Sequence, residues 1–372
     1  MKVPFVDFAA HVRGLRPQLD AALARVLDSG WFILGPEGEA FERELADALG
    51  ARDAVAVANG TDALQLGLRA LGVGEGDEVV TSSISAAFTA LAIQQAGARP
   101  VFVDVDARTL NLDPARAEAA LTPRTRAIVP VHLYGHPAEM APLVARADRH
   151  GLALLEDACQ AHGARYEGRP VGTLRGERGI GALSFYPTKN LGALGDGGAV
   201  LVNDPALAAR LRQLRNGGQS NRYRHEAFGV NSRLDELQAA ILRVSLAQLE
   251  RWTARRRELA DYYRRELAGS GLSLPQEQPY ARAVHHLFVV RHPRRDALAA
   301  ALAERGIGTL IHYPIPLHLQ PAFAGLGRRP GDLPIAERAC SEILSLPLYP
   351  ELRDEQAAAV VAAVRDVLPR LC

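Results

Sequence analysis

The residue of this chain best suited to covalent chemistry is Lys189. Only two of the 43 basic residues are lysines, Lys2 and Lys189, so arginine carries nearly all of the positive charge. Lys2 lies near a terminus, where few constraints act. A primary amine, unlike a guanidinium, can lose its proton and attack a carbonyl. We therefore interpret Lys189 as a candidate nucleophile rather than as a chance survivor on a loop.

A candidate partner for this amine lies upstream, in the segment A-L-L-E-D-A-C-Q-A-H-G. This segment ends a buried strand in Glu156-Asp157, and Gln160 and His162 follow. Open α/β sheets bind their ligands at the carboxyl ends of parallel strands. A carboxylate there can keep a pyridine nitrogen protonated, as the acid that accompanies the Schiff-base lysine does in pyridoxal-phosphate (PLP) sites.

A candidate phosphate site precedes both residues. The segment A-V-A-N-G-T-D-A-L-Q-L runs from a strand through Asn59-Gly60-Thr61 into a helix, whose first amides and the Thr61 hydroxyl can bind an anion. Each feature alone has a plainer reading, such as a helix cap or a tight turn. Together, in this order, they predict a PLP site. Glycines that let the backbone approach a bulky group follow Lys189, at Gly192, Gly195, Gly197 and Gly198.

The elements that must position these residues form an α/β pattern between about Ala54 and Val202. Short apolar runs alternate with amphipathic helical stretches, which indicates a mostly parallel sheet flanked by helices. The seven expected strands are Ala54–Ala58, Glu78–Thr81, Pro100–Val105, Ala127–Val131, Ala153–Glu156, Ala182–Phe185 and Ala199–Val202. Two helices are expected before this region, at Arg16–Leu27 and Glu39–Leu49. Three are expected within it, at Thr61–Leu71, Ala86–Ala96 and Ala138–His150.

The pattern changes after Asn231. Residues Leu234 to Leu267 indicate one long, arginine-rich helix. We therefore expect a large domain over residues 1–240 and a smaller α+β domain over residues 241–372, entered through that helix. The smaller domain is expected to contain a strand at His286–Arg291, a helix at Asp296–Glu304, a proline-rich loop at Pro314–Pro321 and two further helices.

Composition narrows the classes of function. A net charge of +1 offers no electrostatic footprint for nucleic acid or an anionic membrane. No apolar run approaches the ~20 residues of a membrane helix, and no signal peptide is evident. Cys159, Cys340 and Cys372 are too far apart for a disulfide framework or a zinc site, and His312 and His318 lack a metal-binding spacing. We expect a cytoplasmic protein without a metal.

The sequence resembles the DegT/StrS family of nucleotide-sugar aminotransferases, PLP enzymes of fold type I, over nearly its whole length. The motifs are N-G-T-D-A-L, E-D-A-C-Q-A-H-G, S-F-Y-P-T-K-N-L-G, G-V-N-S-R-L-D-E-L-Q-A-A and I-H-Y-P-I-P-L-H-L-Q. The resemblance implies that Lys189 binds the cofactor covalently, that Asp157 pairs with its pyridine nitrogen and that Gln160 lies beside the ring. The residues that it assigns to the phosphate are Gly60, Thr61, Asp62 and Ser184.

The resemblance also implies a homodimer with shared active sites, in which Asn231 reaches the phosphate of the neighbouring subunit's cofactor. The stretch Arg222–His225 and the loop His312–His318 would border the sugar nucleotide. The individual residues expected to contact this substrate are Tyr186, Arg222, Tyr223, His312, Tyr313 and His318.

One position departs from the family pattern. The family stacks an aromatic side chain on the pyridine ring from a T-(F/Y/W)-x-A-T segment. Here the aligned stretch is S-A-A-F-T, which puts Ala86 at that position and Phe88 two residues later. Either Phe88 takes over the stacking and contacts the cofactor, or it belongs to the core, the commoner fate of a lone phenylalanine.

The predicted reaction is a two-stage amino transfer from an amino acid, by resemblance L-glutamate, to a keto-sugar nucleotide. The loop Ile311–Gln320, stiffened by Pro314 and Pro316, resembles those of members that aminate C3, so a dTDP-3-keto-6-deoxyhexose is the expected acceptor. Alternatives are a UDP-linked 3-keto N-acetylhexosamine uronate, a 4-keto sugar, and sugar dehydration, against which Lys189 argues because those relatives often carry histidine there. A non-catalytic regulatory protein on the same fold is an alternative of another class.

Overall fold

The central sheet consists of two sets of strands, which are joined by the segment Ala153–Asp157. In the computed structural model, which describes residues 1–371, the orders are β3-β2-β4-β5 and β6-β9-β10-β1. β5 and β6 are halves of one predicted strand: between them the Leu155 amide donates to the Ile128 carbonyl (3.1 Å), and the Asp157 amide then donates to Pro130 (2.9 Å). The strands are β1 (Asp53–Val57), β2 (Glu78–Ser82), β3 (Arg99–Val103), β4 (Thr125–Val129), β5 (Ala153–Leu154), β6 (Glu156–Asp157), β9 (Ile180–Ser184) and β10 (Gly198–Val202).

The strand directions confirm the predicted mostly parallel α/β sheet. Every paired neighbour runs parallel except β10, which is antiparallel to both β9 and β1. β2 and β10 are buried along their whole length. β10 shows the near-continuous apolar pattern of a strand buried on both faces, whereas β2 also buries the polar residues Glu78, Thr81 and Ser82.

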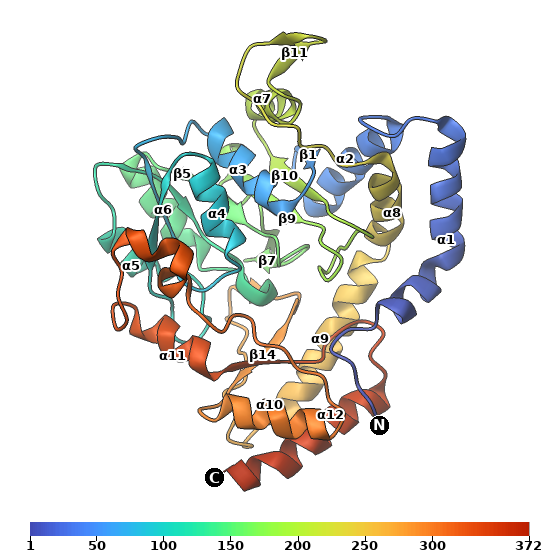
Figure 1. Ribbon diagram of the computed structural model, residues 1–372, viewed down its shortest axis with the longest axis vertical. Helices are drawn as coiled ribbons and strands as arrows, with labels where there is room; N and C mark the ends of the chain where they lie inside the picture. Colours follow the sequence, from blue (N-terminus) through green and yellow to red (C-terminus); the bar gives the residue numbers. More distant parts are fainter. Residues whose placement is uncertain (372) are drawn as a thin grey trace.

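Helices cover both faces of this sheet (Figure 1). Alternate side chains of β1 point to opposite faces: Val55 and Val57 pack with α3, α4 and α7, whereas Ala54 and Ala56 pack with α2, α5, α6 and α8. Among residues 1–371, no helix is long and apolar enough to span a membrane. The helices are α1 (Phe8–Ser29), α2 (Pro36–Leu49), α3 (Gly60–Ala70), α4 (Phe88–Gln95), α5 (Pro114–Ala119), α6 (Met140–His150), α7 (Pro205–Arg215) and α8 (Glu236–Leu246).

The C-terminal part has a core of its own. Tyr263, Phe288 and Leu344 are fully buried in it, and β14 pairs antiparallel with β15. The proposed division near residue 240 stays a prediction. The elements here are α9 (Leu249–Glu266), β14 (Phe288–Arg291), α10 (Arg295–Glu304), η3 (Leu317–Leu319), η4 (Pro321–Leu326), α11 (Pro334–Glu342), β15 (Ile343–Leu346), α12 (Asp354–Val367) and η5 (Leu368–Leu371).

The remaining short strands form two small sheets of their own. β7 (Arg165–Tyr166) pairs with β8 (Arg169–Pro170) and with β13 (Ala281–Arg282). β11 (Gln219–Asn221) and β12 (Arg224–His225) form a hairpin that projects from the body of the molecule beyond α7 (Figure 1). The two 3₁₀ turns are η1 (Leu133–Gly135) and η2 (Gly176–Arg178).

The prediction of one long helix from Leu234 to Leu267 is wrong. The segment contains α8 and α9, separated at Ala247-Gln248. The turn tightens there, because the Gln248 amide donates to the Ser245 carbonyl (3.0 Å), an i to i−3 bond that breaks the helical register. α8 packs on α1 and α2, whereas α9 supplies the C-terminal core, so each helix serves a different set of neighbours.

Candidate active site

Lys189 lies in a tight loop that follows β9. The loop is closed by a backbone hydrogen bond from the Ala193 amide to the Phe185 carbonyl (2.8 Å). Glycine is needed at residue 192, because a Cβ there would lie 2.5 Å from the Pro187 carbonyl oxygen. One of the four glycines that follow the lysine therefore folds the lysine loop back on itself.

The neighbouring residue ties this loop to the start of the C-terminal part. The Asn190 amide nitrogen donates to the Val284 carbonyl (3.0 Å), and its oxygen lies 3.2 Å from His286 Nδ1. Burial and the nearby charge of Lys189 hold the pKa of His286 well below its usual value. His286 is therefore neutral, and its Nδ1–H can donate to Asn190.

The surroundings of Lys189 favour its reactive form. Burial lowers the pKa of the Lys189 amine below its ordinary value, while Cys159 and Asp157 oppose this shift. Burial and the charge of Asp157 raise the pKa of the Cys159 thiol well above its usual value, which leaves Asp157 as the carboxylate beside the amine. A partly buried amine with a lowered pKa is more readily unprotonated, and that form attacks carbonyls and accepts protons.

Asp157 is fixed at the carboxyl end of β6 by two donors. Its side chain is almost fully buried; Oδ2 accepts a hydrogen bond from Thr89 Oγ1 (2.8 Å), and Oδ1 accepts one from the Cys159 amide (3.1 Å). Sequence reasoning missed Thr89. The available signal was its place in S-A-A-F-T, the stretch that departs from the family pattern.

The start of α3 forms an anion-binding corner next to Ser184. Asn59 caps the helix by accepting a hydrogen bond from the Asp62 amide (2.9 Å). Gly60 has no room for a side chain, because a Cβ would come within 2.6 Å of Ser184 Cβ. Within residues 1–371, the amides of Gly60 and Thr61 have no hydrogen-bond partner. Free helix N-terminal amides beside a hydroxyl suit a phosphate.

Asp62 uses its polar groups within the protein. Its amide is engaged by Asn59, and its Oδ2 accepts a hydrogen bond from Ser232 Oγ (2.6 Å). Ser232 Oγ in turn accepts a hydrogen bond from the Ala58 amide (3.0 Å). A direct contact between Asp62 and a phosphate stays a prediction, and its observed contacts join the start of α3 to the segment next to Asn231.

Gln160, His312 and Tyr313 are brought together, although they are far apart in the sequence. The Gln160 oxygen accepts a hydrogen bond from the Tyr134 amide (2.8 Å), and its nitrogen donates to the Tyr313 hydroxyl (3.3 Å). The His312 ring lies 2.8 Å from Ser345 Oγ through Nδ1. Burial and the charge of Lys189 lower the pKa of His312 to about 4, so this imidazole is neutral at pH 7.

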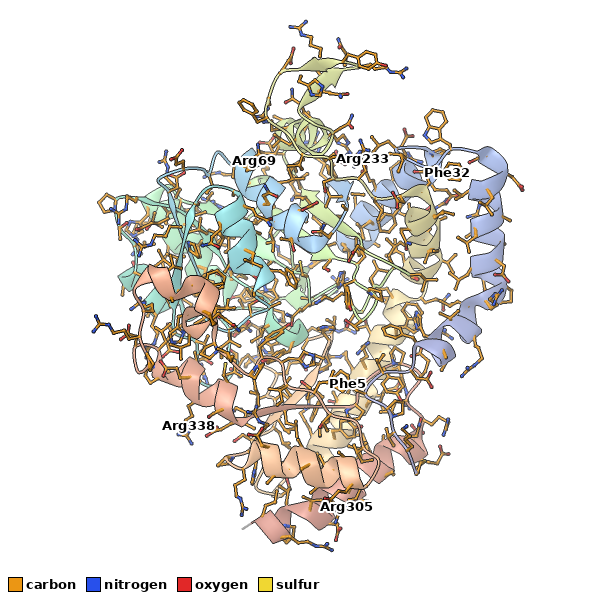
Figure 2. All side chains as sticks on the ribbon, viewed as in Figure 1. Phe5, Phe32, Arg69, Arg233, Arg305 and Arg338 are labelled. Atoms are coloured by element: carbon orange, nitrogen blue, oxygen red, sulfur yellow. The ribbon has the colours of Figure 1, made fainter. Side chains whose placement is uncertain are left out.

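The N-terminal segment also reaches this loop. The Phe5 ring, labelled in Figure 2, stacks on the His312 ring with centroids 5.6 Å apart. The Tyr134 hydroxyl donates to the His312 carbonyl. Three separate parts of the chain therefore hold His312 in place.

Several predicted site residues are not gathered at this cluster. Phe88 is 60% exposed at the start of α4, so its interpretation as a core residue is wrong. Tyr186 is also exposed, within the lysine loop. His318 is buried in η3, and its Nε2 lies 3.1 Å from Glu337 of α11. Its predicted contact with substrate stays a prediction.

The predicted substrate contacts that lie on the β11–β12 hairpin are exposed in the single chain. Tyr223 is 81% exposed at the hairpin turn, and the Arg222 guanidinium lies 5.2 Å from the centre of its ring. Asn231 is exposed and forms an antiparallel bridge with Asn216. Whether these residues and Phe88 contact substrate or cofactor stays a prediction.

The groups that do converge match the functional groups of PLP. Lys189 offers an amine for the aldehyde, Asp157 a fixed carboxylate for the pyridine nitrogen, and the start of α3 with Ser184 offers donors for the phosphate. Within residues 1–371, no three His, Cys, Asp or Glu side chains are arranged to hold a metal ion. The arrangement suits carbonyl chemistry and proton transfer at one carbon.

Comparisons with known proteins agree with this chemistry. Residues 15–365 match the family model described as the DegT/DnrJ/EryC1/StrS aminotransferase family. The chain is 52% identical over 371 residues to dTDP-3-amino-3,4,6-trideoxy-alpha-D-glucose transaminase of Streptomyces venezuelae, covering 100% of this chain and 97% of that protein. It is also 52% identical to the erythromycin biosynthesis sensory transduction protein EryC1 of Saccharopolyspora erythraea, covering 98% and 99% of the two chains. The crystal structure of S. venezuelae DesV has a TM-score of 0.97 and 53% identity, covering 99% of this chain and 98% of that one.

Proposed function

The chain belongs to the DegT/DnrJ/EryC1/StrS aminotransferase family, and on this premise we propose that it transfers an amino group from L-glutamate to C3 of a dTDP-3-keto-6-deoxyhexose. The observation that carries the enzymatic assignment is the placement of Lys189, an amine with a lowered pKa, in the loop after β9, beside the strand β6 that ends in the fixed carboxylate of Asp157. The 52% identity to a dTDP-3-amino-sugar transaminase supports the choice of acceptor.

The cofactor is PLP, which when bound supplies an electron sink for the negative charge that develops at the substrate carbon. Lys189 would hold the cofactor through its amine, and the same amine, when free, would take the proton from the donor Cα as a general base and return a proton as a general acid. Asp157 orients the pyridine ring and keeps the ring nitrogen protonated. The amides of Gly60 and Thr61, with Ser184, hold the phosphate.

The acceptor pocket is formed by neutral polar groups. His312 is uncharged because its pKa is lowered, and Tyr313 keeps its proton because burial raises the pKa of the phenol. Hydroxyl and imidazole groups can donate to and accept from sugar hydroxyls without the desolvation cost of a charge. The Phe5 contact and the Ser345 hydrogen bond hold His312 in a fixed position, which limits the entropy lost on binding.

We expect turnover of a 3-keto nucleotide sugar and little turnover of the matched 4-keto isomer. A site built to hydrogen-bond one arrangement of oxygens rejects the other by about 10²-fold or more in kcat/KM, because a buried polar group would be left unpaired. The measurement is kcat/KM for both isomers, with the amine of the product located by NMR. Amination at C4 without turnover of any 3-keto sugar would refute the substrate assignment and leave aminotransferase chemistry intact.

One further acceptor, one other reaction and one non-catalytic role are alternatives that the same assay tests. A UDP-linked 3-keto N-acetylhexosamine uronate tests the nucleotide and the 6-substituent, and release of water instead of amine transfer would indicate a dehydratase. A regulatory protein without catalysis is the reading that the name of the S. erythraea relative suggests. A protein that binds PLP but turns over no keto sugar with glutamate would favour it.

We also propose that the active unit is a cytoplasmic homodimer in which Asn231 completes the neighbouring subunit's phosphate site. Support comes from two exposed residues that lie close together in the chain, Asn231 and Phe228. The Phe228 side chain is 93% exposed. Aromatic side chains are enriched at protein interfaces relative to the rest of the surface.

Mixing two inactive variants should restore activity if the sites are shared. Lys189→Ala and Asn231→Ala dimers each lack one residue at every site, whereas a mixed dimer has one site with both residues intact. Equal mixing with subunit exchange is expected to give about one quarter of wild-type activity, because half of the dimers are mixed and each has one working site. Full activity of Asn231→Ala alone, or an active monomer in sedimentation, would contradict shared sites.

A further inference from the structure

The carboxylate of Asp157 is the end point of a short chain of buried hydroxyl groups. Thr89 Oγ1 donates to Asp157 Oδ2 (2.8 Å), and Ser85 Oγ lies 3.0 Å from Thr89 Oγ1. Thr89 is 2% and Ser85 is 3% exposed, so water does not compete for these bonds. Both hydroxyls come from the stretch S-A-A-F-T at the start of α4.

The direction of this chain follows from the number of protons. A hydroxyl has one proton to donate, and an ionised carboxylate can only accept. Thr89 must therefore donate its hydrogen bond to Asp157. Ser85 in turn has to donate a hydrogen bond to Thr89. Donors that point the same way along a chain polarise one another and strengthen the last bond.

The two hydrogen bonds to Asp157 leave part of its carboxylate free to accept another. The Cys159 amide occupies one position on Oδ1 (3.1 Å), and Thr89 occupies one on Oδ2. A carboxylate has about four acceptor positions, so a pyridinium N–H can still be accepted. Donors that reach the charged form favour it over the protonated acid.

We propose that Thr89, oriented by Ser85, is a positioning residue that keeps Asp157 ionised and so keeps the proton on the cofactor's ring nitrogen. This inference rests on the proposed function, because it assigns the task of Asp157 to a pyridine nitrogen. Thr89 suits the task because its branched side chain restricts χ1, which limits the directions that the hydroxyl can take. The two hydroxyls lie at the two ends of S-A-A-F-T, and between them Ala86 stands where the family pattern has an aromatic residue on the ring.

The test replaces Thr89 by valine, which keeps the shape and removes the donor. Thr81→Val is the matched control: Thr81 is equally buried, but its hydroxyl donates to the Val129 carbonyl (2.8 Å) rather than to a carboxylate. Each protein is loaded with PLP labelled with ¹⁵N in the ring, and the nitrogen signal reports whether the ring is protonated. We expect Thr89→Val to move this signal toward the unprotonated position, with kcat reduced about 10- to 100-fold, as for loss of a hydrogen bond to a charged group.

Two milder variants keep the test decisive if Thr89→Val does not fold. Thr89→Ser retains the hydroxyl and should keep the wild-type signal. Ser85→Ala should move the signal in the same direction as Thr89→Val by a smaller amount, with kcat reduced about two- to tenfold. An unchanged signal in Thr89→Val, or in Ser85→Ala where Thr89→Val does not fold, overturns the proposal, as does an equal shift in Thr81→Val. Failure of the proposed function is distinguishable, because the wild-type protein would then bind no labelled PLP or transfer no amine.

Discussion

Replacing Lys189 by alanine is expected to abolish amino transfer and the yellow colour of the PLP-loaded protein. Lys189 has two tasks in the proposed reaction, covalent attachment of the cofactor and proton transfer at the substrate carbon. General acid–base catalysis alone contributes up to about 10⁴-fold, so kcat should fall by at least about 10⁴-fold. The measurements are the visible absorption spectrum and the rate with glutamate and a 3-keto nucleotide sugar.

The chain offers a matched control for this variant. Lys2 is the other lysine and is exposed near the N-terminus, so Lys2→Ala removes the same kind of side chain without touching the site. Lys2→Ala should keep the colour and the full rate. A yellow and active Lys189→Ala protein would contradict the central assignment.

The lowered pKa of Lys189 also predicts how stability responds to its removal. Because the pKa in the folded cofactor-free protein lies below the ordinary 10.5, the folded state disfavours the charged amine. This cost is fully present below the folded-state pKa and disappears as the pH rises toward 10.5. Lys189→Met removes the cost, so cofactor-free Lys189→Met should melt no lower than the wild type at pH 7, and the difference should shrink at high pH. A melting temperature well below that of the wild type would contradict a buried, unfavourable charge.

The sequence allowed the sheet and the lysine loop to be predicted because their signals are local. A strand buried on both faces is apolar along its length, as β10 is, and the bend at Gly192 needs a glycine whatever lies elsewhere in the chain. The same reasoning located Asp157, since a carboxylate that ends a buried strand is visible in the sequence.

The contacts that were missed depend on residues brought together only by the fold. Thr89 and Asp157 are 68 positions apart, so no local pattern connects them. His318 looked like a residue of an open loop, yet it is buried, and its partner Glu337 comes from a helix that follows. The break between α8 and α9 likewise depends on which neighbours each half must pack against, while the local pattern stays helical through it.

The second large effect is expected for Asp157→Asn. The variant keeps the size and most hydrogen bonds of the side chain, so it should fold and bind PLP. A neutral amide cannot stabilise a positive ring nitrogen, and the loss of one partner of a buried charge pair costs about 3–5 kcal/mol. This corresponds to a kcat lower by roughly 10²- to 10⁴-fold. The rate is measured at saturating substrate, with PLP content checked by absorbance.

Glu156, the residue next to Asp157, provides a control that separates the loss of charge at Asp157 from a loss of packing. Glu156 is fully buried, but its side chain points away from the site, where it accepts hydrogen bonds from the amides of Gly172 (2.7 Å) and Leu174 (2.6 Å) and lies 3.1 Å from His132. Glu156→Gln replaces one of these acceptor oxygens by a donor, so it should lower the melting temperature while kcat of the folded protein stays within a few-fold of wild type. Asp157→Asn should show the opposite pattern, with a small change in melting temperature and a large loss of rate. If Asp157→Asn retained the wild-type kcat, the ring nitrogen would need another partner, and both the role of Asp157 and the hydroxyl chain behind it would have to be abandoned.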